Sequence, residues 1–278
     1  MKNYVKTHKI HGETLYLENG DIKLGIPLEF GLRISYLSYK GSDNLFFEQT
    51  NDMTDLTTFD GWRVRGGHRL WTAPEGAHCY HPDNDRITYQ LSENGVSLFQ
   101  IKDPRINMEK IMHISFLKDN CLEIKHEIRN LSDNKCRVAL WPITSVDGGG
   151  VEEIYLNKQK DGCLPTNVIT TWSYTSLGDE RAEFTTDKIT IRHKPTSKLF
   201  KIGVGRPSAP VKYTNKGVVF TKSFDIFPEK EYTDGNVSYE TYMCDHMVEL
   251  ESLSPLYDIL PGEVRSHREI WELKSEGE

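Results

Sequence analysis

Hydrophobic and polar residues alternate along much of the chain with a period of two. In the clearest case, 122–129, positions 122, 124, 126 and 128 form a mostly apolar face, while positions 123, 125, 127 and 129 are all charged. Successive side chains of a strand point to opposite faces of a sheet, so this pattern predicts a half-buried strand. Turn residues follow at 130–134, and a second extended run, Cys136–Trp141, stops at Pro142. The pair predicts a β-hairpin.

Short runs of the same kind recur along the whole chain, separated by clusters of Gly, Asn, Asp and Ser. The further runs are Thr14–Leu17, Ile22–Ile26, Arg33–Tyr39, Ile87–Leu91, Val96–Ile101, Ile111–Phe116, Ile189–His193, Val218–Thr221, Met247–Leu250 and Glu269–Leu273. No segment has the period of an amphipathic helix of three turns. Many short strands with frequent turns predict an all-β fold, a large antiparallel sandwich or barrel.

The chain shows no linker, no low-complexity tract and no internal repeat of fixed period. Its 278 residues are enough to bury one large core, and a β-sandwich of this size often forms one unit, so we expect a single domain over 1–278. The glycine-rich segment Asp147–Gly150 lacks the Lys-Ser/Thr of a phosphate-binding loop. It is expected to be a loop at the rim of the sandwich.

Composition argues against several classes of protein. The net charge is −7 without a basic stripe, so nucleic acid is not an expected partner. No stretch approaches the ~18 apolar residues of a membrane span, and the N-terminus lacks the apolar core of a signal peptide. The cysteines show no CxxC, so no disulfide framework or zinc site is expected and a cytoplasmic location is favoured. They are scattered and odd in number: Cys79, Cys121, Cys136, Cys163 and Cys244.

The segment Arg63–Glu75 has the most unusual composition. It places three arginines, a histidine, a tryptophan and a carboxylate around a Gly-Gly pair. Glycine lets a backbone approach a ligand closely, Arg and His donate to hydroxyls, and Trp can stack on the apolar face of a sugar. The alternative is a strained bend with surface arginines, but a buried Arg–Glu pair without a role would be costly. Arg63, Arg65 and Arg69 would also suit a phosphate or carboxylate.

Histidines at four other places carry weaker signals. His78 and His81 suggest a metal site, but no third ligand stands at a recognisable spacing, so solvated loop histidines are favoured. His126 shares the apolar face of its predicted strand and is expected to be a core histidine. His113 lies in a strand pattern whose buried face the sequence leaves open.

Two glutamates near the C-terminus share one face of a predicted strand. Glu249 and Glu251 stand two positions apart, which separates them by about 6.6 Å along a strand. If that face lines a cleft, their mutual repulsion would raise the pKa of one carboxylate and suit it to general-base work. On alternation alone, a solvent face with two ordinary glutamates is slightly favoured.

A series of motifs in a fixed order resembles the galactose-mutarotase-like superfamily over nearly the whole chain. The motifs are Gly31-Leu-Arg-Ile34 with Asn44-Leu45, Gly66-Gly-His-Arg-Leu-Trp71 with Pro74-Glu75, Ile128-Arg-Asn130 with Ala139-Leu-Trp-Pro142, and Glu249-Leu-Glu251 with Leu260-Pro-Gly-Glu263 and Glu269-Ile-Trp-Glu-Leu273. The resemblance implies a β-supersandwich of large antiparallel sheets with a sugar-binding cleft.

For the aldose 1-epimerases of this superfamily, the resemblance also implies a reaction. A glutamate near the C-terminus takes the proton of the anomeric hydroxyl while a histidine donates to the ring oxygen. The ring opens, C1 rotates and the ring closes on the other face, without metal or organic cofactor. The matching glutamate here is Glu251, in Leu250-Glu251 ahead of Leu260-Pro-Gly-Glu263. The place of the acid histidine holds Trp141, so another group would have to be the acid.

The leading prediction is therefore an aldose 1-epimerase-like enzyme that interconverts anomers of a free sugar or sugar derivative without a cofactor. Glu251 would be the base and His68 the acid, with His113 as the second choice for the acid. The residues expected to bind and orient the sugar are Arg65, Arg69, Glu75, His113, Trp141 and Glu249. The alternative is a non-catalytic carbohydrate-binding protein on the same fold. A lyase or hydrolase ranks below both, because superfamily lyases usually carry an added helical domain.

Overall fold

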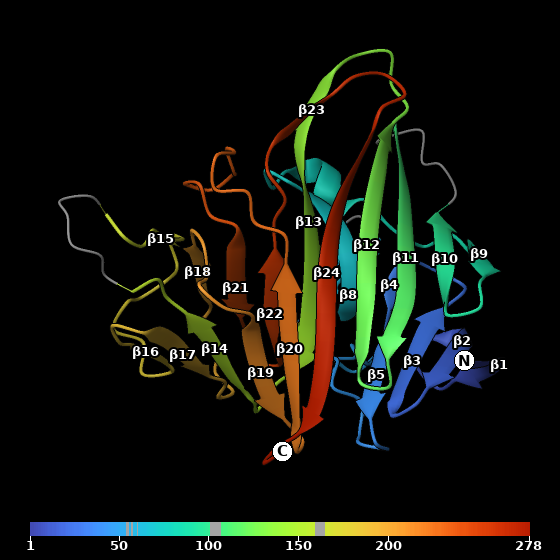
Figure 1. The fold of residues 1–278 in the computed structure, drawn as a ribbon, viewed down its shortest axis with the longest axis horizontal. Helices are drawn as coiled ribbons and strands as arrows, with labels where there is room; N and C mark the ends of the chain where they lie inside the picture. Colours follow the sequence, from blue (N-terminus) through green and yellow to red (C-terminus); the bar gives the residue numbers. More distant parts are fainter. Residues whose placement is uncertain (54–55, 57, 60, 101–106, 159–164) are drawn as a thin grey trace.

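The computed structural model describes residues 1–53, 56, 58–59, 61–100, 107–158 and 165–278 (Figure 1). Apart from one short 3-10 helix, η1 (Ala77–Tyr80), the regular elements in these ranges are strands. Every strand pairing among them is antiparallel, for example β11 with β12 and β13 with β22. The structure thus confirms the predicted all-β fold with large antiparallel sheets.

Two large sheets make up most of the molecule (Figure 1). The ten-stranded sheet has the order β16 (Ala182–Phe184), β17 (Lys188–Arg192), β14 (Val151–Tyr155), β19 (Val211–Asn215), β20 (Val218–Phe224), β24 (Val264–Ser275), β12 (Cys121–Asn130), β11 (Met108–Lys118), β10 (Gly95–Gln100) and β9 (Ile87–Leu91). The eight-stranded sheet has the order β15 (Ile169–Thr171), β18 (Phe200–Val204), β21 (Tyr239–Met243), β22 (Met247–Ser252), β13 (Cys136–Asp147), β8 (Gly67–Ala73) and β4 (Arg33–Ile34), with β23 (Tyr257–Ile259) paired to β13.

Two smaller sheets complete the fold. One has four strands in the order β1 (Lys2–His8), β2 (Gly12–Asn19), β3 (Ile22–Pro27) and β5 (Tyr36–Tyr39). The other is the pair β6 (Thr58–Phe59) and β7 (Trp62–Arg63). In Figure 1 the four-stranded sheet lies near the β9–β11 end of the ten-stranded sheet.

The main hydrophobic core lies between the inner faces of the two large sheets. Leu122 and Ile124 of β12 and Trp271 of β24 belong to the same buried cluster as Val248 and Leu250 of β22. All five side chains are 0% exposed. The two-residue period sends alternate side chains of each strand into this layer, and full burial of one such side chain contributes about 1.5–3 kcal/mol.

The predicted hairpin of β12 and β13 is wrong. β12 pairs with β11 and β24 in the ten-stranded sheet, whereas β13 pairs with β8, β22 and β23 in the eight-stranded sheet. The turn residues 130–134 therefore carry the chain from one sheet to the other. Alternation and turn residues identify strands and their ends, but they do not say which strand lies alongside, because pairing partners are distant in sequence.

The predicted end of the second strand at Pro142 is also wrong, since β13 continues to Asp147. Pro142 lies between the stretch 136–138, which pairs with β23, and the stretch 143–147, which pairs with β22. The Leu140 N–H, two residues earlier and on the same side of the strand, donates to Ser254 Oγ. The register of β13 with β22 places Pro142 opposite Ser252, the last residue of β22, so the missing N–H falls at the end of that ladder.

The other predicted runs coincide with strands, with one division. Arg33–Tyr39 is split at Ser35: β4 pairs with β8, whereas β5 pairs with β3. The last residue of Val96–Ile101 lies outside the described residues. Asp147–Gly150 joins β13 to β14, and so joins the two large sheets, as a loop at the rim would.

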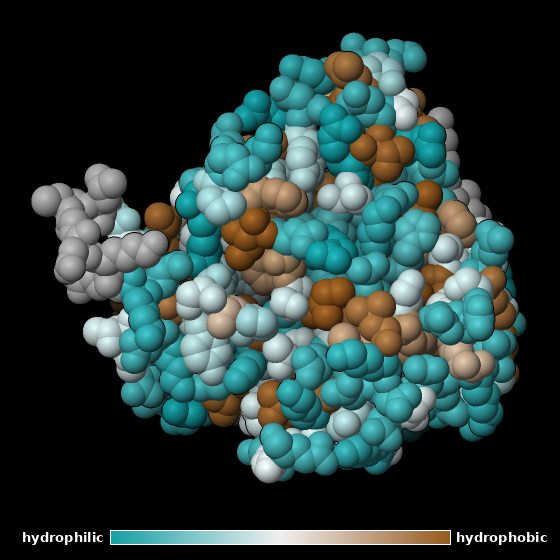
Figure 2. Space-filling model, in the orientation of Figure 1, coloured by the Kyte–Doolittle hydropathy of each residue, from teal (hydrophilic) through white to brown (hydrophobic). Residues whose placement is uncertain are grey.

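Hydrophilic residues cover most of the face seen in Figure 2, with hydrophobic residues in small, separate groups. Among the described residues, no helix has the length and apolar character needed to cross a membrane. Four cysteines are free thiols, and Cys163 lies outside the described residues.

A polar cluster interrupts the apolar layer between the large sheets. His68 of β8 and His126 of β12 face each other with their Nε2 atoms 2.8 Å apart. The Lys222 ammonium lies 2.9 Å from Glu269 Oε1 and donates to Thr144 Oγ1 at 2.9 Å. These five side chains are fully buried. His126 is thus the core histidine that its strand position predicted.

Burial keeps the histidines of this cluster neutral. It lowers the pKa of His126 to about 3, even though the nearby Glu269 carboxylate acts in the opposite direction. Burial likewise lowers the pKa of His267 to about 4. The Nε2 atom of His267 is hydrogen bonded to Ser252 Oγ. In the unfolded chain both imidazoles would titrate near 6.5. Protons therefore bind the unfolded state first as the pH falls.

The fold should consequently lose stability between pH 7 and pH 5. Each neutral buried histidine contributes up to about 1.4 kcal/mol per pH unit in this window, and the contribution is complete above about 6.5. We expect His126→Gln to reduce the slope of the unfolding free energy against pH, measured by urea titration. His113→Gln, whose side chain is 33% exposed, is the control and should keep the original slope. Equal slopes in all three proteins would contradict this account.

Candidate functional site

A cavity of about 590 Å³ opens on the outer face of the eight-stranded sheet. The same alternation that fills the core turns alternate residues of β8, β13 and β22 toward this cavity, and β18 and β21 contribute one residue each. Its strand-borne lining comprises Arg69, Trp71, Trp141, Ile143, Lys201, Tyr242, Met247, Glu249 and Glu251. The volume lies within the usual range for small-molecule sites.

Aromatic rings form much of the cavity wall. Trp71 and Trp141 meet edge to face with ring centroids 5.5 Å apart, and Trp62 lies 5.6 Å from Trp71. Trp172, Tyr174, Tyr80 and Tyr242 also line the cavity. Such rings offer apolar faces for the C–H surface of a sugar, while their N–H and O–H groups can bond its hydroxyls.

At the floor of the cavity, the Glu251 carboxylate is fixed through one oxygen. Its Oε2 atom accepts hydrogen bonds from Trp141 Nε1 at 2.8 Å and from Lys201 Nζ at 3.0 Å. Its Oε1 atom has no hydrogen-bond partner in the part of the chain that the structure describes. The carboxylate is therefore oriented through Oε2, while its buried Oε1 atom makes no hydrogen bond to the described residues.

Lys201 is enclosed by two carboxylates and two indole rings. Its ammonium also pairs with Glu240 Oε2 at 2.8 Å, and it lies 4.7 Å from the ring centres of both Trp141 and Trp172. Register explains the cluster, because Glu240 of β21 stands directly opposite Glu251 of β22, and β18 is the next strand. Cation–π contacts of this kind stabilise an ammonium that has lost its water.

The pKa of Glu251 departs from that of a carboxylate in a simple ion pair, whereas the pKa of Lys201 does not. Burial raises the pKa of Glu251, the Lys201 ammonium lowers it, and the neighbouring Glu249 carboxylate raises it again, with a net rise. Burial alone would lower the pKa of Lys201, but Glu251 and Glu240 raise it above its usual value. Lys201 therefore stays charged, while Glu251 binds a proton more readily than an exposed glutamate does.

A second buried pair lies beside the first. Arg69 Nη1 and Nη2 each lie 3.3 Å from Glu249 Oε1, which also accepts a hydrogen bond from Ser145 Oγ at 2.7 Å. The guanidinium carbon of Arg69 lies 4.8 Å from the centre of the Trp71 ring. Arg69 thus pairs with Glu249 rather than with Glu75 of its own segment, and Glu249 and Glu251 lie on one cavity face.

The Gly-Gly bend before β8 serves the chain itself. Gly66 and Gly67 have positive φ angles of 81° and 70°, as does Arg65 at 57°. A Cβ atom on Gly66 would lie 2.0 Å from the Phe47 carbonyl oxygen, and one on Gly67 2.3 Å from the Ile34 carbonyl oxygen. The glycines thus allow close approach of backbone to backbone. They set the register that aims Arg69 and Trp71 into the cavity.

The structure brings together five of the residues predicted for the site. Arg69, Trp141, Glu249 and Glu251 line the cavity from adjacent strands, and Glu75 joins them after β8 ends. Glu75 accepts a hydrogen bond from the Tyr80 hydroxyl across the η1 turn. The binding and base roles of these five residues stay predictions.

Three other predicted residues lie elsewhere. His68 occupies the opposite face of β8 from Arg69 and Trp71, in the polar cluster between the sheets, and does not line the cavity. Arg65 stacks on Phe30 with its guanidinium carbon 4.0 Å from the ring centre, beside a separate pocket. His113 of β11 lies in the ten-stranded sheet, where its Nδ1 bonds Ser97 Oγ at 2.8 Å. In these positions none of the three can touch a ligand in the cavity.

The cavity also contains residues that the sequence patterns did not single out. They are Lys201, Trp172, Tyr174, Tyr242 and His246. Of these, His246 stands directly before β22, and its ring stacks on Phe47 with centroids 6.2 Å apart. It stands three residues ahead of Glu249, so alternation alone assigns it to the opposite face and gave no signal for the cavity. Lys201 carried none, because one lysine in a short β-run resembles a solvent-facing residue.

Comparisons with known proteins give the fold a place among solved structures. No model of a known family matches the chain, and no curated protein matches it. In structure, it resembles the Slr1438 protein from Synechocystis sp. PCC 6803, with a TM-score of 0.60 and 13% identity over 99% of this chain and 100% of that one.

Two further structures carry the superfamily's own description. A galactose mutarotase-like protein from Lactobacillus casei ATCC 334 has a TM-score of 0.60 and 12% identity over 94% of this chain and 100% of that one. A galactose mutarotase-like protein from Clostridium acetobutylicum has a TM-score of 0.57 and 10% identity over 98% and 99%. These likenesses confirm the predicted galactose mutarotase-like β-sandwich at the level of the fold.

The charge cluster in the cavity yields a stability prediction. Lys201→Met would leave two buried carboxylates without their cation, so we expect the unfolding free energy at pH 7 to fall by about 3–5 kcal/mol. The loss should shrink toward pH 5, because carboxylates without a cation are more readily protonated in the folded state. Lys198→Met, an exposed lysine on the same segment, should change stability by less than about 0.5 kcal/mol in the same urea titrations. A Lys201 variant as stable as the Lys198 control would contradict the cluster's role.

Proposed function

We propose that the cavity binds a small neutral carbohydrate and that Glu251 acts as a general base in the interconversion of its anomers. The observation that carries this proposal is the Glu251 carboxylate, which is fixed through Oε2 while Oε1 has no partner among the described residues. Burial raises its pKa, and a base with a pKa nearer neutrality accepts a proton more effectively. The galactose mutarotase-like fold agrees with such a ligand.

In the proposed reaction, Glu251 Oε1 takes the proton of the anomeric hydroxyl while the bond between C1 and the ring oxygen breaks. A carbonyl forms at C1, and the ring oxygen takes a proton from an acid of the cavity. After rotation about the C1–C2 bond, the steps run in reverse and the ring closes on the other face of C1. Protons alone are exchanged, so the chemistry calls for no cofactor.

His246 is the acid that the cavity favours over the earlier choices. It is the one histidine among the described lining residues, whereas His68 and His113 lie outside the cavity. Lys201 is a poor donor, because its two carboxylate neighbours raise its pKa. Tyr174 is also a weak donor, because burial raises its pKa to about 12.

A specific observation favours a second candidate function, the binding of a sugar without turnover. The position that the superfamily's acid would occupy holds Trp141, whose Nε1 is hydrogen bonded to Glu251. The Lys201 ammonium next to the same carboxylate favours its ionised form and so reduces its basicity. Under this alternative, the two groups would fix Glu251 as an acceptor for sugar hydroxyls.

The charges in the cavity argue for an uncharged sugar. The two cationic side chains of the lining, Arg69 and Lys201, are each paired with glutamates. Four carboxylates line the same space: Glu75, Asp245, Glu249 and Glu251. A phosphate or carboxylate on the ligand would thus meet repulsion without a free cation. The suggested anion-binding role of Arg63, Arg65 and Arg69 does not suit this cavity.

The cytoplasmic location stays a prediction.

The base assignment can be tested by NMR saturation transfer between α and β anomers over a panel of neutral aldoses. We expect the unchanged chain to accelerate exchange for at least one sugar, and Glu251→Gln to lower that acceleration about 10²–10⁴-fold while sugar binding persists. Glu272→Gln, on β24 outside the cavity lining, is the control and should exchange normally.

The outcomes separate the two candidate functions. Calorimetric binding of a sugar without any accelerated exchange would favour the binding protein. If the exchange of anomers is equally fast in Glu251→Gln, Glu251 is not the base of the reaction.

Charge selectivity gives a further test. A neutral aldose should bind at least about 10-fold more tightly than its 6-phosphate, because the carboxylates of the cavity repel the phosphate. A repulsion of about 1.4 kcal/mol is enough for a tenfold difference in affinity. Glu249→Gln, which releases Arg69 from its partner, should narrow that ratio. Isothermal calorimetry at low and high salt measures both. Tighter binding of the phosphate ester by the unchanged chain would contradict the assignment of a neutral ligand.

A further inference from the structure

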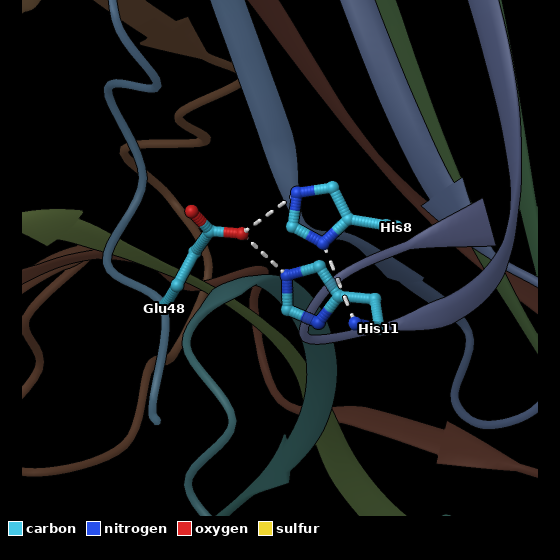
Figure 3. A group of neighbouring side chains, drawn as sticks. All are labelled: His8, His11 and Glu48. Carbon is cyan, nitrogen blue, oxygen red and sulfur yellow. Dashed lines mark hydrogen bonds and ion pairs between the residues drawn. The ribbon is translucent and has the colours of Figure 1, made fainter. Parts of the chain in front are cut away.

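Two histidines and one glutamate converge at the N-terminal hairpin, away from the cavity (Figure 3). His8 ends β1, His11 lies in the turn before β2, and Glu48 lies beyond the buried Phe46-Phe47 pair. The His8 and His11 rings stack with centroids 4.7 Å apart and an interplanar angle of 13°. Both Nε2 atoms point at one oxygen of Glu48, at 3.6 Å for His8 and 2.7 Å for His11.

We propose that His8, His11 and Glu48 form a binding site for one divalent first-row transition-metal ion, such as Zn²⁺. Two imidazole nitrogens and a carboxylate oxygen are the donor set that such ions prefer, whereas Mg²⁺ and Ca²⁺ prefer oxygen alone. The three donor atoms lie within 4.8 Å of one another.

The geometry fits such an ion with small adjustments. Donor atoms about 2.0–2.1 Å from a tetrahedral zinc stand about 3.3 Å from each other. The two Nε2–Oε1 distances of 3.6 Å and 2.7 Å lie on either side of that value. The side chains of His8 and Glu48 are 19% and 20% exposed, so an ion has access, while His11 at 3% is held firmly. Three protein ligands would leave a fourth position for water.

Coordination would have a defined effect on the turn. In the metal-free protein, His8 Nδ1 accepts the Ile10 N–H at 3.2 Å and the His11 N–H at 3.4 Å. Nδ1 must then be unprotonated, and the ring proton sits on Nε2, facing Glu48. A metal on Nε2 displaces that proton, and the neutral ring carries its proton on Nδ1 instead. Both amide hydrogen bonds are long, so their loss costs little, but it leaves a signature at Ile10 and His11.

A second His–His–Glu group in the molecule does not suit a metal. His68, His126 and Glu269 also converge, but all three are fully buried between the sheets. The Lys222 ammonium lies 2.9 Å from Glu269 Oε1, and Trp271 Nε1 donates to Glu269 Oε2 at 2.9 Å. A cation there would face an ammonium and find both carboxylate oxygens in use. The partly exposed group has neither obstacle.

The proposed site would link the N-terminal hairpin to the segment that contains Glu48, which pairs with the Gly-Gly bend at Gly66. Glu48 forms an isolated β-bridge with Gly66, and its neighbour Phe47 packs against His246 at the cavity wall. An ion bound by His8, His11 and Glu48 would therefore link the four-stranded sheet to the backbone that supports the cavity. The role is structural and independent of whether the cavity turns over a sugar.

The test is calorimetric titration of the chelator-treated full chain with Zn²⁺, followed by ¹⁵N NMR. We expect one ion per chain at this site, with the Ile10 and His11 amides among the most shifted, and no competition from millimolar Mg²⁺. Glu48→Gln and His8→Gln should each weaken the binding at least 10-fold. Circular dichroism without metal identifies any variant that fails to fold, and the other variant then decides.

His78→Gln is the matched control, since this exposed histidine lies beside Cys79, another potential zinc ligand. It should leave the affinity and the amide shifts unchanged. Three results would each overturn the proposal: no Zn²⁺ binding at 1 mM by the unchanged chain, an affinity lost with His78→Gln rather than with the two site variants, or shifts that spare the Ile10 and His11 amides.

Discussion

The ion cluster around Lys201 is the interaction on which the candidate site depends. One ammonium, buried against two indole rings, pairs with Glu240 at 2.8 Å and Glu251 at 3.0 Å. Without it, Glu251 would be an isolated buried carboxylate and would take up a proton. With it, the carboxylate can be ionised inside a cavity, where its free oxygen is worth more as an acceptor than it would be in water. The cluster is thus costly to assemble.

The period of two makes that arrangement possible. The strands β8, β18 and β22 of the eight-stranded sheet are buried on both faces, but the two faces differ in chemistry. In β22, Val248 and Leu250 pack into the core, while Glu249 and Glu251 face the cavity. A shift of one residue in the pairing of β22 would send both carboxylates into the core. The register of β22 is therefore determined by the same burial that places the two carboxylates in the cavity.

The sequence predicted the architecture well and the site in part. Alternation revealed the strands, and the glutamate pair stood out because both members share one strand face. His68, predicted as the acid, does not lie in the cavity. Adjacent residues of β8 face opposite sides of the sheet, and His68 points into the layer between the two large sheets while Arg69 points into the cavity. Lys201 and the β12–β13 separation depend on which strands lie side by side. That information comes from contacts between distant residues, which local patterns do not carry.

The most direct test of the central claim is the pH dependence of the protein-catalysed exchange of anomers. If Glu251 is the base, the rate should hold at neutral pH and fall as the pH drops through a pKa above the ordinary 4.5 of a glutamate, since only the ionised form accepts a proton. Glu251→Asp should keep this acidic limb at a reduced rate. A catalysed rate without an acidic limb above pH 4.5, or no catalysed exchange for any sugar that the cavity binds, would contradict the account.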